Sequence, residues 1–263
     1  CATTVIFDSR PDTHFLAVGL LRGSSGAIAL YTVTPGSRFP VLQHVHETAV
    51  EAPVGALGVL GGRLVAGVGP ILRTYDVGRA RLLRKAELRL PSAVTAMAAY
   101  AGSPRLWVGT LRHSVLALRV LPTDGRLVRV AADCVPRGVM RMVALDTATV
   151  AAWDRLGAFF VVRIASAGGG LLPDDDESTL AVLASPASSP PYVERSADFY
   201  VGDIAVGLAP AHSSASAHLA ARHAAPSGVS SLPLLYTTLT GAIGVIHAFT
   251  NSSMAREVSA LQD

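Results

Sequence analysis

The sequence predicts an all-β fold of the β-propeller class, with about five four-stranded blades of a ring of about seven. Short apolar runs rich in Val, Leu and Ile recur along most of the chain and are separated by Gly, Pro, Asp or Ser. These runs are typical of short strands, because helical periodicity is mostly absent. They also fall into successive sets of four, with a small residue repeated at intervals close to 40 residues.

The first three sets each contain four expected strands joined by turn residues. In chain order they are 3–7, 15–20, 27–33 and 41–46; then 54–60, 63–68, 71–77 and 82–88; then 94–100, 105–110, 115–120 and 127–132. In each set a tight turn joins the second strand to the third, which predicts an antiparallel pair. The pattern indicates one blade for each set.

A fourth set is expected at 139–145, 149–153, 159–164 and 199–201, and a fifth begins with 204–208, 234–238 and 243–249. Two insertions interrupt these sets, at about 165–191 and 209–230. Neither segment offers enough apolar side chains to offset the conformational entropy lost on folding, so we expect both to lie outside the blades. We assign residues 1–250 to a partial propeller. Residues 251–263 suit the start of a C-terminal helix, with Ser252 or Ser253 as its N-cap.

Small residues mark the second strand of each set. Gly19, Gly67, Gly109 and Ala152 are separated by 48, 42 and 43 residues. A small side chain at this place allows neighbouring blades to approach closely. Blades bury their faces only against neighbours, so we expect the missing blades to come from sequence before Cys1 or after Asp263.

The composition limits the classes of partner that we expect the chain to bind. A formal charge of +3 over 263 residues is too dilute to indicate nucleic-acid binding. The two cysteines, Cys1 and Cys134, are too few for a disulfide framework or a zinc site and favour a reducing compartment. No apolar stretch approaches the roughly 20 residues of a membrane-spanning helix, so no membrane partner is expected.

The stretch Gly61–Lys85, which reads GGRLVAGVGPILRTYDVGRARLLRK, resembles the third propeller of the splicing factor 3b subunit 3 family. Further segments resemble the same family in the same order: VPR at 135–137, LDTATVAAWDRLGAFFVVR at 145–163, YVGD at 200–203 and LYTTLTGAIGVI at 235–246. The sequence departs from the family at Ala158, Phe159 and the insertion at 209–230. The large cleavage and polyadenylation subunit and the damaged-DNA-binding scaffold of cullin ligases share this architecture and remain alternatives.

The resemblance implies a nuclear, non-catalytic scaffold of splicing factor 3b in the U2 small nuclear ribonucleoprotein, which supports branch-site recognition and spliceosome assembly. It implies a HEAT-repeat subunit, a small companion subunit and other U2 proteins as partners, with little or no direct nucleic-acid contact. An adaptor of a cullin ubiquitin ligase, or of pre-mRNA cleavage and polyadenylation, is the alternative function.

No catalytic, cofactor or metal site is expected. The sequence contains no nucleophile elbow, His-Glu-x-x-His motif or phosphate-binding loop, and Gly168–Gly170 lacks the following Lys-Ser/Thr. His44 and His46 share one face of an expected strand, but no third ligand has useful spacing. The acidic run at 174–177 lacks the alternation of a calcium loop.

Two regions are candidates for partner binding. Arg79, Arg81, Arg84 and Lys85, with Arg73 and Arg89, form a basic cluster suited to an acidic partner surface. Protein contact ranks ahead of RNA contact there, because no aromatic residues for base stacking lie nearby. The turns Arg112-His113 and Asp154-Arg155 are expected on one propeller face, since equivalent turns of successive blades emerge together.

Overall fold

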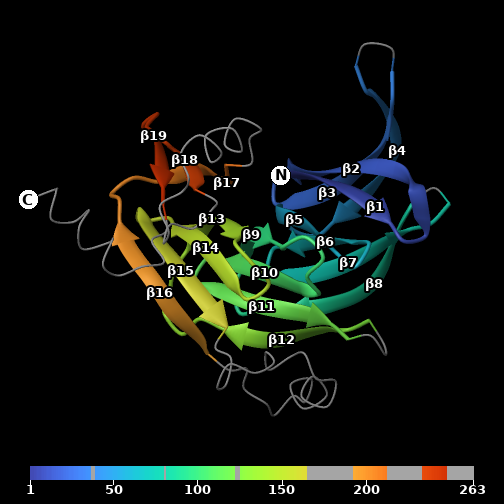
Figure 1. Ribbon diagram of the computed structural model, residues 1–263. Coiled ribbons are helices and arrows are strands. Elements are labelled where there is room, and N and C mark those ends of the chain that lie inside the picture. Colours follow the sequence, from blue (N-terminus) through green and yellow to red (C-terminus); the bar gives the residue numbers. More distant parts are fainter. Residues whose placement is uncertain (37–38, 80, 122–124, 165–191, 212–232, 248–263) are drawn as a thin grey trace, which may run out of the picture. The chain divides into compact units, whose positions relative to one another are not determined.

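The computed structural model describes residues 1–36, 39–79, 81–121, 125–164, 192–211 and 233–247 (Figure 1). These residues form strands and turns, with no helix among them. The chain divides into two compact units, Cys1–Gly202 and Asp203–Asp263. None of the described residues belongs to a helix long and apolar enough to cross a membrane. The predicted C-terminal helix and most of both predicted insertions lie outside the described residues.

The first unit contains four antiparallel sheets of four strands, which we call blades 1 to 4. Blade 1 comprises β1 (Ala2–Phe7), β2 (Arg10–Arg22), β3 (Ser25–Thr34) and β4 (Val41–Val50). Blade 2 comprises β5 (Val54–Leu60), β6 (Arg63–Val68), β7 (Ile71–Val77) and β8 (Leu82–Arg89). Blade 3 comprises β9 (Val94–Ala98), β10 (Arg105–Thr110), β11 (Val115–Val120) and β12 (Leu127–Ala132). Blade 4 comprises β13 (Val139–Ala144), β14 (Thr149–Asp154), β15 (Ala158–Ile164) and β16 (Val193–Tyr200).

The described part of the second unit is a three-stranded antiparallel sheet in the order β17-β18-β19. Its strands are β17 (Ala205–Pro210), β18 (Leu234–Thr238) and β19 (Ile243–Ile246). Four-stranded blades in sequence order, followed by the strands of a fifth sheet, confirm the predicted β-propeller class.

Three apolar cores fill the spaces between successive blades. Phe7 and Phe15 of blade 1 share a core with Leu64 of blade 2, whereas Val65 of blade 2 faces blade 3. The third core joins blades 3 and 4 and contains Trp107. Because neighbouring side chains on one strand point to opposite faces and both faces are covered, the inner strands are continuous apolar runs rather than alternating ones.

The repeated spacing of small residues along the chain has a steric cause in the structure. A Cβ atom added to one of these glycines would lie under 3 Å from the first valine of the next blade. The contacts are Gly19 with Val54 at 2.8 Å, Gly67 with Val94 at 2.5 Å and Gly109 with Val139 at 2.6 Å. The prediction that a small residue here allows close approach of blades is confirmed, and Ala152, at the equivalent place in β14, is fully buried.

Several expected boundaries were wrong. The strands β2, β4 and β9 run over Arg10–Arg22, Val41–Val50 and Val94–Ala98 rather than 15–20, 41–46 and 94–100. The outermost strand of blade 4, β16, runs from Val193 to Tyr200 rather than 199–201. Almost every residue of β16 is exposed, so its sequence VERSADFY carries no apolar run to mark it. The strand β17 extends to Pro210, into the expected insertion at 209–230. A proline is compatible with that position because it is the last residue of the strand.

Candidate protein-interaction surface

The turn between β7 and β8 carries the first part of the predicted basic cluster. Arg79 and Arg81 are exposed and, with His46, line a shallow depression of about 500 Å³. The turn is held by blade 1, because the Arg10 guanidinium donates to the carbonyl of Arg79 over 2.9 Å. In a second contact between the two blades, the hydroxyl of Ser9 donates to Asp76 Oδ1 over 2.7 Å. Contacts from blade 1 therefore position the turn that carries two exposed cationic side chains.

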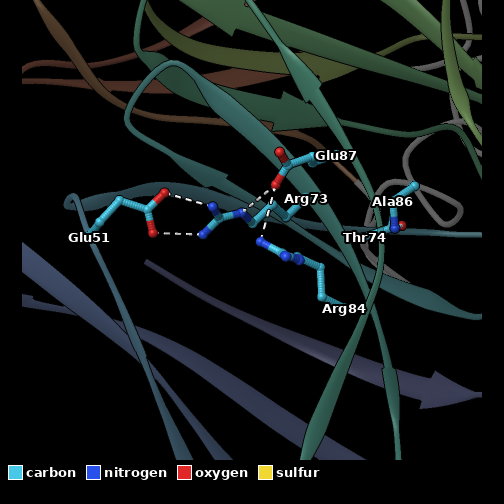
Figure 2. A network of polar contacts seen from close by, with 6 residues as sticks. All are labelled: Glu51, Arg73, Thr74, Arg84, Ala86 and Glu87. Atoms are coloured by element: carbon cyan, nitrogen blue, oxygen red, sulfur yellow. Dashed lines mark hydrogen bonds and ion pairs between the residues drawn. The ribbon is translucent and has the colours of Figure 1, made fainter.

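Arg73 and Arg84 of the basic cluster are engaged within the protein, as Figure 2 shows. Arg73 donates two hydrogen bonds of 2.7 Å to the carboxylate of Glu51 and a third of 3.3 Å to Glu87. Arg84 also contacts Glu87, at 3.3 Å. Lys85 is exposed at a bulge in β8, where the register with β7 shifts. Among the described residues, the cluster thus comprises an ion-pair network formed by Arg73 and Arg84, and exposed cations outside that network at Arg79, Arg81, Lys85 and Arg89.

The buried arginine in this network is stabilised in its charged form. Its side chain is only 10% exposed, whereas that of Glu51 is 53% exposed. The hydrogen bonds from Arg73 lower the pKa of Glu51 below its ordinary value, and the Glu51 carboxylate raises the pKa of Arg73. Glu51 lies in the segment between blades 1 and 2, so the pair attaches that connection to the middle of blade 2.

The two other predicted turns meet at a second depression, of about 430 Å³. Its lining includes Arg112 from the β10–β11 turn, Arg155 from the β14–β15 turn and Arg137 from the segment between blades 3 and 4. His113 is exposed but does not line it. The structure therefore brings Arg112 and Arg155 together, as the placement of equivalent turns led us to expect.

Asp154 is not available as a surface contact, contrary to our expectation. It is only 6% exposed, and its Oδ1 atom accepts hydrogen bonds from the backbone N–H groups of Leu156 and Ala158, at 2.8 and 2.9 Å. A carboxylate in a tight turn satisfies nearby backbone donors in this way. The residue shapes the turn that presents Arg155.

Arg137 is the surface residue that sequence reasoning missed. Its guanidinium lies 4.4 Å from the centre of the Phe160 ring and donates to Asp198 Oδ2 over 2.5 Å. This contact lowers the pKa of Asp198 below its ordinary value. The only sequence signal for Arg137 was its place in the VPR segment, because Asp198 lies 61 residues further along the chain.

The two histidines of β4 do not share a face, contrary to our expectation. A bulge in the pairing with β3 places His44 opposite Tyr31 and His46 opposite Leu30. Consecutive residues of β3 point to opposite faces, so the two imidazoles do as well. Among the described residues, no group of three His, Cys, Asp or Glu side chains is arranged to hold a metal ion.

A concavity of about 1050 Å³ is lined by residues of blades 1 to 3. Its lining is composed of backbone and small or apolar side chains, with Tyr100 as the one titratable residue among the described ones.

In the second unit, two of the segments that carry the family resemblance meet. Asp203, from the YVGD segment, accepts a hydrogen bond from the hydroxyl of Thr240, in the LYTTLTGAIGVI segment. Hydrogen bonds from Thr238 and Thr240 lower the pKa of Asp203. The matching residues thus stabilise a turn of the β17–β18–β19 sheet.

The blades share apolar cores with their neighbours, and their turns carry depressions lined by arginines. These features are those of a β-propeller protein with charged turns. The chain belongs to the CPSF A subunit region family, which matches residues 3–263.

Several relatives are similar to most of this chain. A pre-mRNA-splicing factor RSE1 of Yarrowia lipolytica is 36% identical over 71% of the chain, and spliceosome-associated protein 130 A of Arabidopsis thaliana is 30% identical over 94%. Splicing factor 3B subunit 3 of Drosophila melanogaster is 29% identical over 90%. The chain spans only 16%, 20% and 19% of the length of these three relatives.

Proposed function

We propose that this chain is part of a protein-interaction scaffold in pre-mRNA splicing, within a splicing factor 3b assembly of the U2 small nuclear ribonucleoprotein. The observation that carries the proposal is similarity to splicing factors over 71% to 94% of the chain. In this proposal residues 1–250 are a partial propeller, the protein acts in the nucleus without catalysis, and it supports branch-site recognition through its partners.

The physical basis of the proposed scaffold is the stiffness of the blades. Successive sheets bury both faces in shared cores, so the turns are held on a rigid base. Rigid presentation lowers the entropic cost of binding. We propose that Arg79 and Arg81, with Lys85 and the partly engaged Arg84, contact an acidic surface of a partner. The HEAT-repeat subunit and the small companion subunit of the assembly are the proposed partners.

Affinity purification of the tagged full chain from nuclear extract, followed by mass spectrometry, tests this function. We expect splicing factor 3b subunits and other U2 proteins to be the main proteins recovered. Recovery of cullin-ligase or cleavage and polyadenylation components instead would favour the alternative adaptor function. Recovery of none of these would contradict both.

Charge reversal tests the proposed contact residues. The variant Arg79→Glu/Arg81→Glu should lower recovery of the partner subunits, because like charges across an interface are repulsive. Arg89→Glu is the control, since Arg89 is an exposed arginine on the outer strand β8 that does not line the depression. Equal recovery with both variants would contradict the assignment of Arg79 and Arg81.

A further inference from the structure

We propose that the depression between blades 3 and 4 docks an acidic segment of a partner protein that also carries an apolar side chain. The lining residues are Leu111, Arg112, Pro136, Arg137, Gly138, Asp154, Arg155 and Leu156. This inference deepens the proposed scaffold function, because it assigns a partner chemistry to one of its surfaces. It depends on the balance of charge, the exposed apolar walls and the rigidity of the site.

The charge of the depression is positive after its internal pairs are taken into account. Arg137 is paired with Asp198, and Asp154 keeps its negative charge although its Oδ1 atom accepts from two backbone N–H groups, so Arg112 and Arg155 leave a net charge of one positive unit. Arg112 and Arg155 are exposed, and neither has a carboxylate partner among the described residues. Two guanidinium groups at one depression are suited to carboxylates, which they bind through paired hydrogen bonds.

Apolar side chains flank these cations. Leu156 is 70% exposed and Leu111 is 36% exposed, and Pro136 lies between the turns that carry them. Leucines left in water beside unpaired arginines are typical of a protein-binding surface rather than a solvated one. An apolar side chain of the docked segment would cover Leu111 and Leu156, while its carboxylates reach Arg112 and Arg155.

The backbone around the depression is held in place before any partner binds. Ser114 has a φ of 56°, a left-handed conformation that is unfavourable for residues other than glycine. It is retained because the Ser114 N–H donates to the Arg137 carbonyl over 3.0 Å and its hydroxyl donates to Asp133 over 2.6 Å. The β10–β11 turn is thereby tied to the segment that supplies Pro136, Arg137 and Gly138.

Gly138 completes the wall between the two turns. A Cβ atom there would lie 2.8 Å from the Leu111 carbonyl oxygen and 2.9 Å from Arg155 Cδ. The arginine stem therefore lies directly against the backbone of Gly138. Contacts of this kind reduce the rotamer entropy that Arg155 would lose on binding.

A nucleic acid fits this depression less well than a peptide. Its lining contains no aromatic side chain on which an unpaired base could stack. Phe160, which lies under Arg137, is itself fully buried. Binding to phosphates alone requires more clustered cations than two free arginines.

Binding of labelled peptides to the purified full chain, followed by fluorescence anisotropy, tests the inference. The probes are a short peptide of acidic residues with a central leucine, the same peptide with the leucine replaced by alanine, and a version with lysines in place of the acidic residues. We expect the acidic leucine peptide to bind best. The variant Arg112→Glu/Arg155→Glu should weaken its binding by at least about tenfold, because two attractive contacts become repulsive.

The matched control is Arg89→Glu/Arg129→Glu, which reverses two exposed arginines of the outer strands β8 and β12. It changes the net charge equally and should leave binding within about twofold, as expected for charges away from the contact. Melting temperatures of both variants should lie close to that of the parent protein, because all four arginines are exposed.

Several results would overturn the inference. These are absence of binding by the acidic leucine peptide, equal binding of the lysine version, equal loss in both double variants, or tighter binding of an oligouridine RNA that depends on Arg112 and Arg155. The assay contains no splicing component, so its failure is separate from failure of the proposed function. Conversely, peptide binding at this site together with recovery of no splicing proteins from nuclear extract would retain the docking site and reject the splicing role.

Discussion

Gly67 of β6 and Val94 of β9 lie so close that a Cβ atom on the glycine would be 2.5 Å from the valine Cβ. The contact joins the second strand of blade 2 to the first strand of blade 3. Gly19 and Gly109 have the same relationship to Val54 and Val139. Small residues therefore repeat in the sequence because one blade approaches the next too closely for a larger side chain at these positions.

The variant Gly67→Ala should lower the free energy of unfolding by about 1–3 kcal/mol, because the added methyl forces two blades apart. Denaturant unfolding measures the loss. Gly58→Ala is the matched control, since its methyl would meet the flexible thioether of Met97 at 3.3 Å. An equal loss in both variants would show that replacing a strand glycine, rather than the contact between blades, is responsible.

Glu51→Gln should lower stability by about 1 kcal/mol at pH 7, a modest value because the carboxylate is half exposed. The hydrogen bonds from Arg73 lower the folded pKa of Glu51 below 4.5. The stabilisation is therefore complete above pH 4.5 and is lost as the pH falls through the folded pKa. Unfolding curves of both proteins between pH 7 and strong acid should converge at the acidic end.

The control for this pair is Glu47→Gln, in which the lost partner is Arg22. That arginine is 61% exposed, whereas the Arg73 side chain is 10% exposed. The control should change stability by less than about 0.5 kcal/mol. A stability difference between Glu51→Gln and the parent that persists at low pH would contradict the role of the Glu51 charge.

Arg137→Lys should destabilise the protein by about 1–2 kcal/mol, because a lysine keeps the charge but loses the planar contact with Phe160 and the forked contact with Asp198. Arg195→Lys removes a more exposed contact to the same carboxylate, at 3.0 Å, and should change stability by less than about 0.5 kcal/mol. Thermal unfolding of the two variants provides the comparison. Equal melting temperatures would be inconsistent with a special role for Arg137.

Asp154→Ala should cost about 1–3 kcal/mol, because the N–H groups of Leu156 and Ala158 lose their acceptor in a turn where Asp154 is buried. Asp154→Asn retains a carbonyl oxygen and should lose less. Asp146→Ala is the control, as that exposed side chain accepts from one backbone group, Ala148. Chemical denaturation should rank the three variants in this order, and a larger loss for Asp146→Ala would refute it.

The sequence predicted buried stretches of strand more accurately than exposed ones. The strands β5, β6, β7, β10, β11, β12 and β18 have the predicted limits. In blades 2 and 3, the apolar side chains of these strands lie in the cores between blades, so apolar runs mark them. The strand β16 was predicted over three residues only, because its exposed side chains need no such pattern.

Individual site residues were harder to predict, because their partners are distant in the chain. Arg73 belongs by sequence to the basic cluster, yet Glu51, 22 residues earlier, binds it. Asp154 was expected at the surface, but its own turn buries it. Arg112 and Arg155 were recognised from their turns alone, because turns of successive blades emerge on one side of a propeller.

The sequence by itself determined the fold class and the blade order, because apolar runs, turn residues and the spacing of small residues are local patterns repeated along the chain. The tertiary structure alone decided which charges are free, since neutralising an arginine depends on a carboxylate that packing brings within hydrogen-bonding distance. It is for this reason that Arg112 and Arg155 remain available, whereas Arg73 and Arg137 do not.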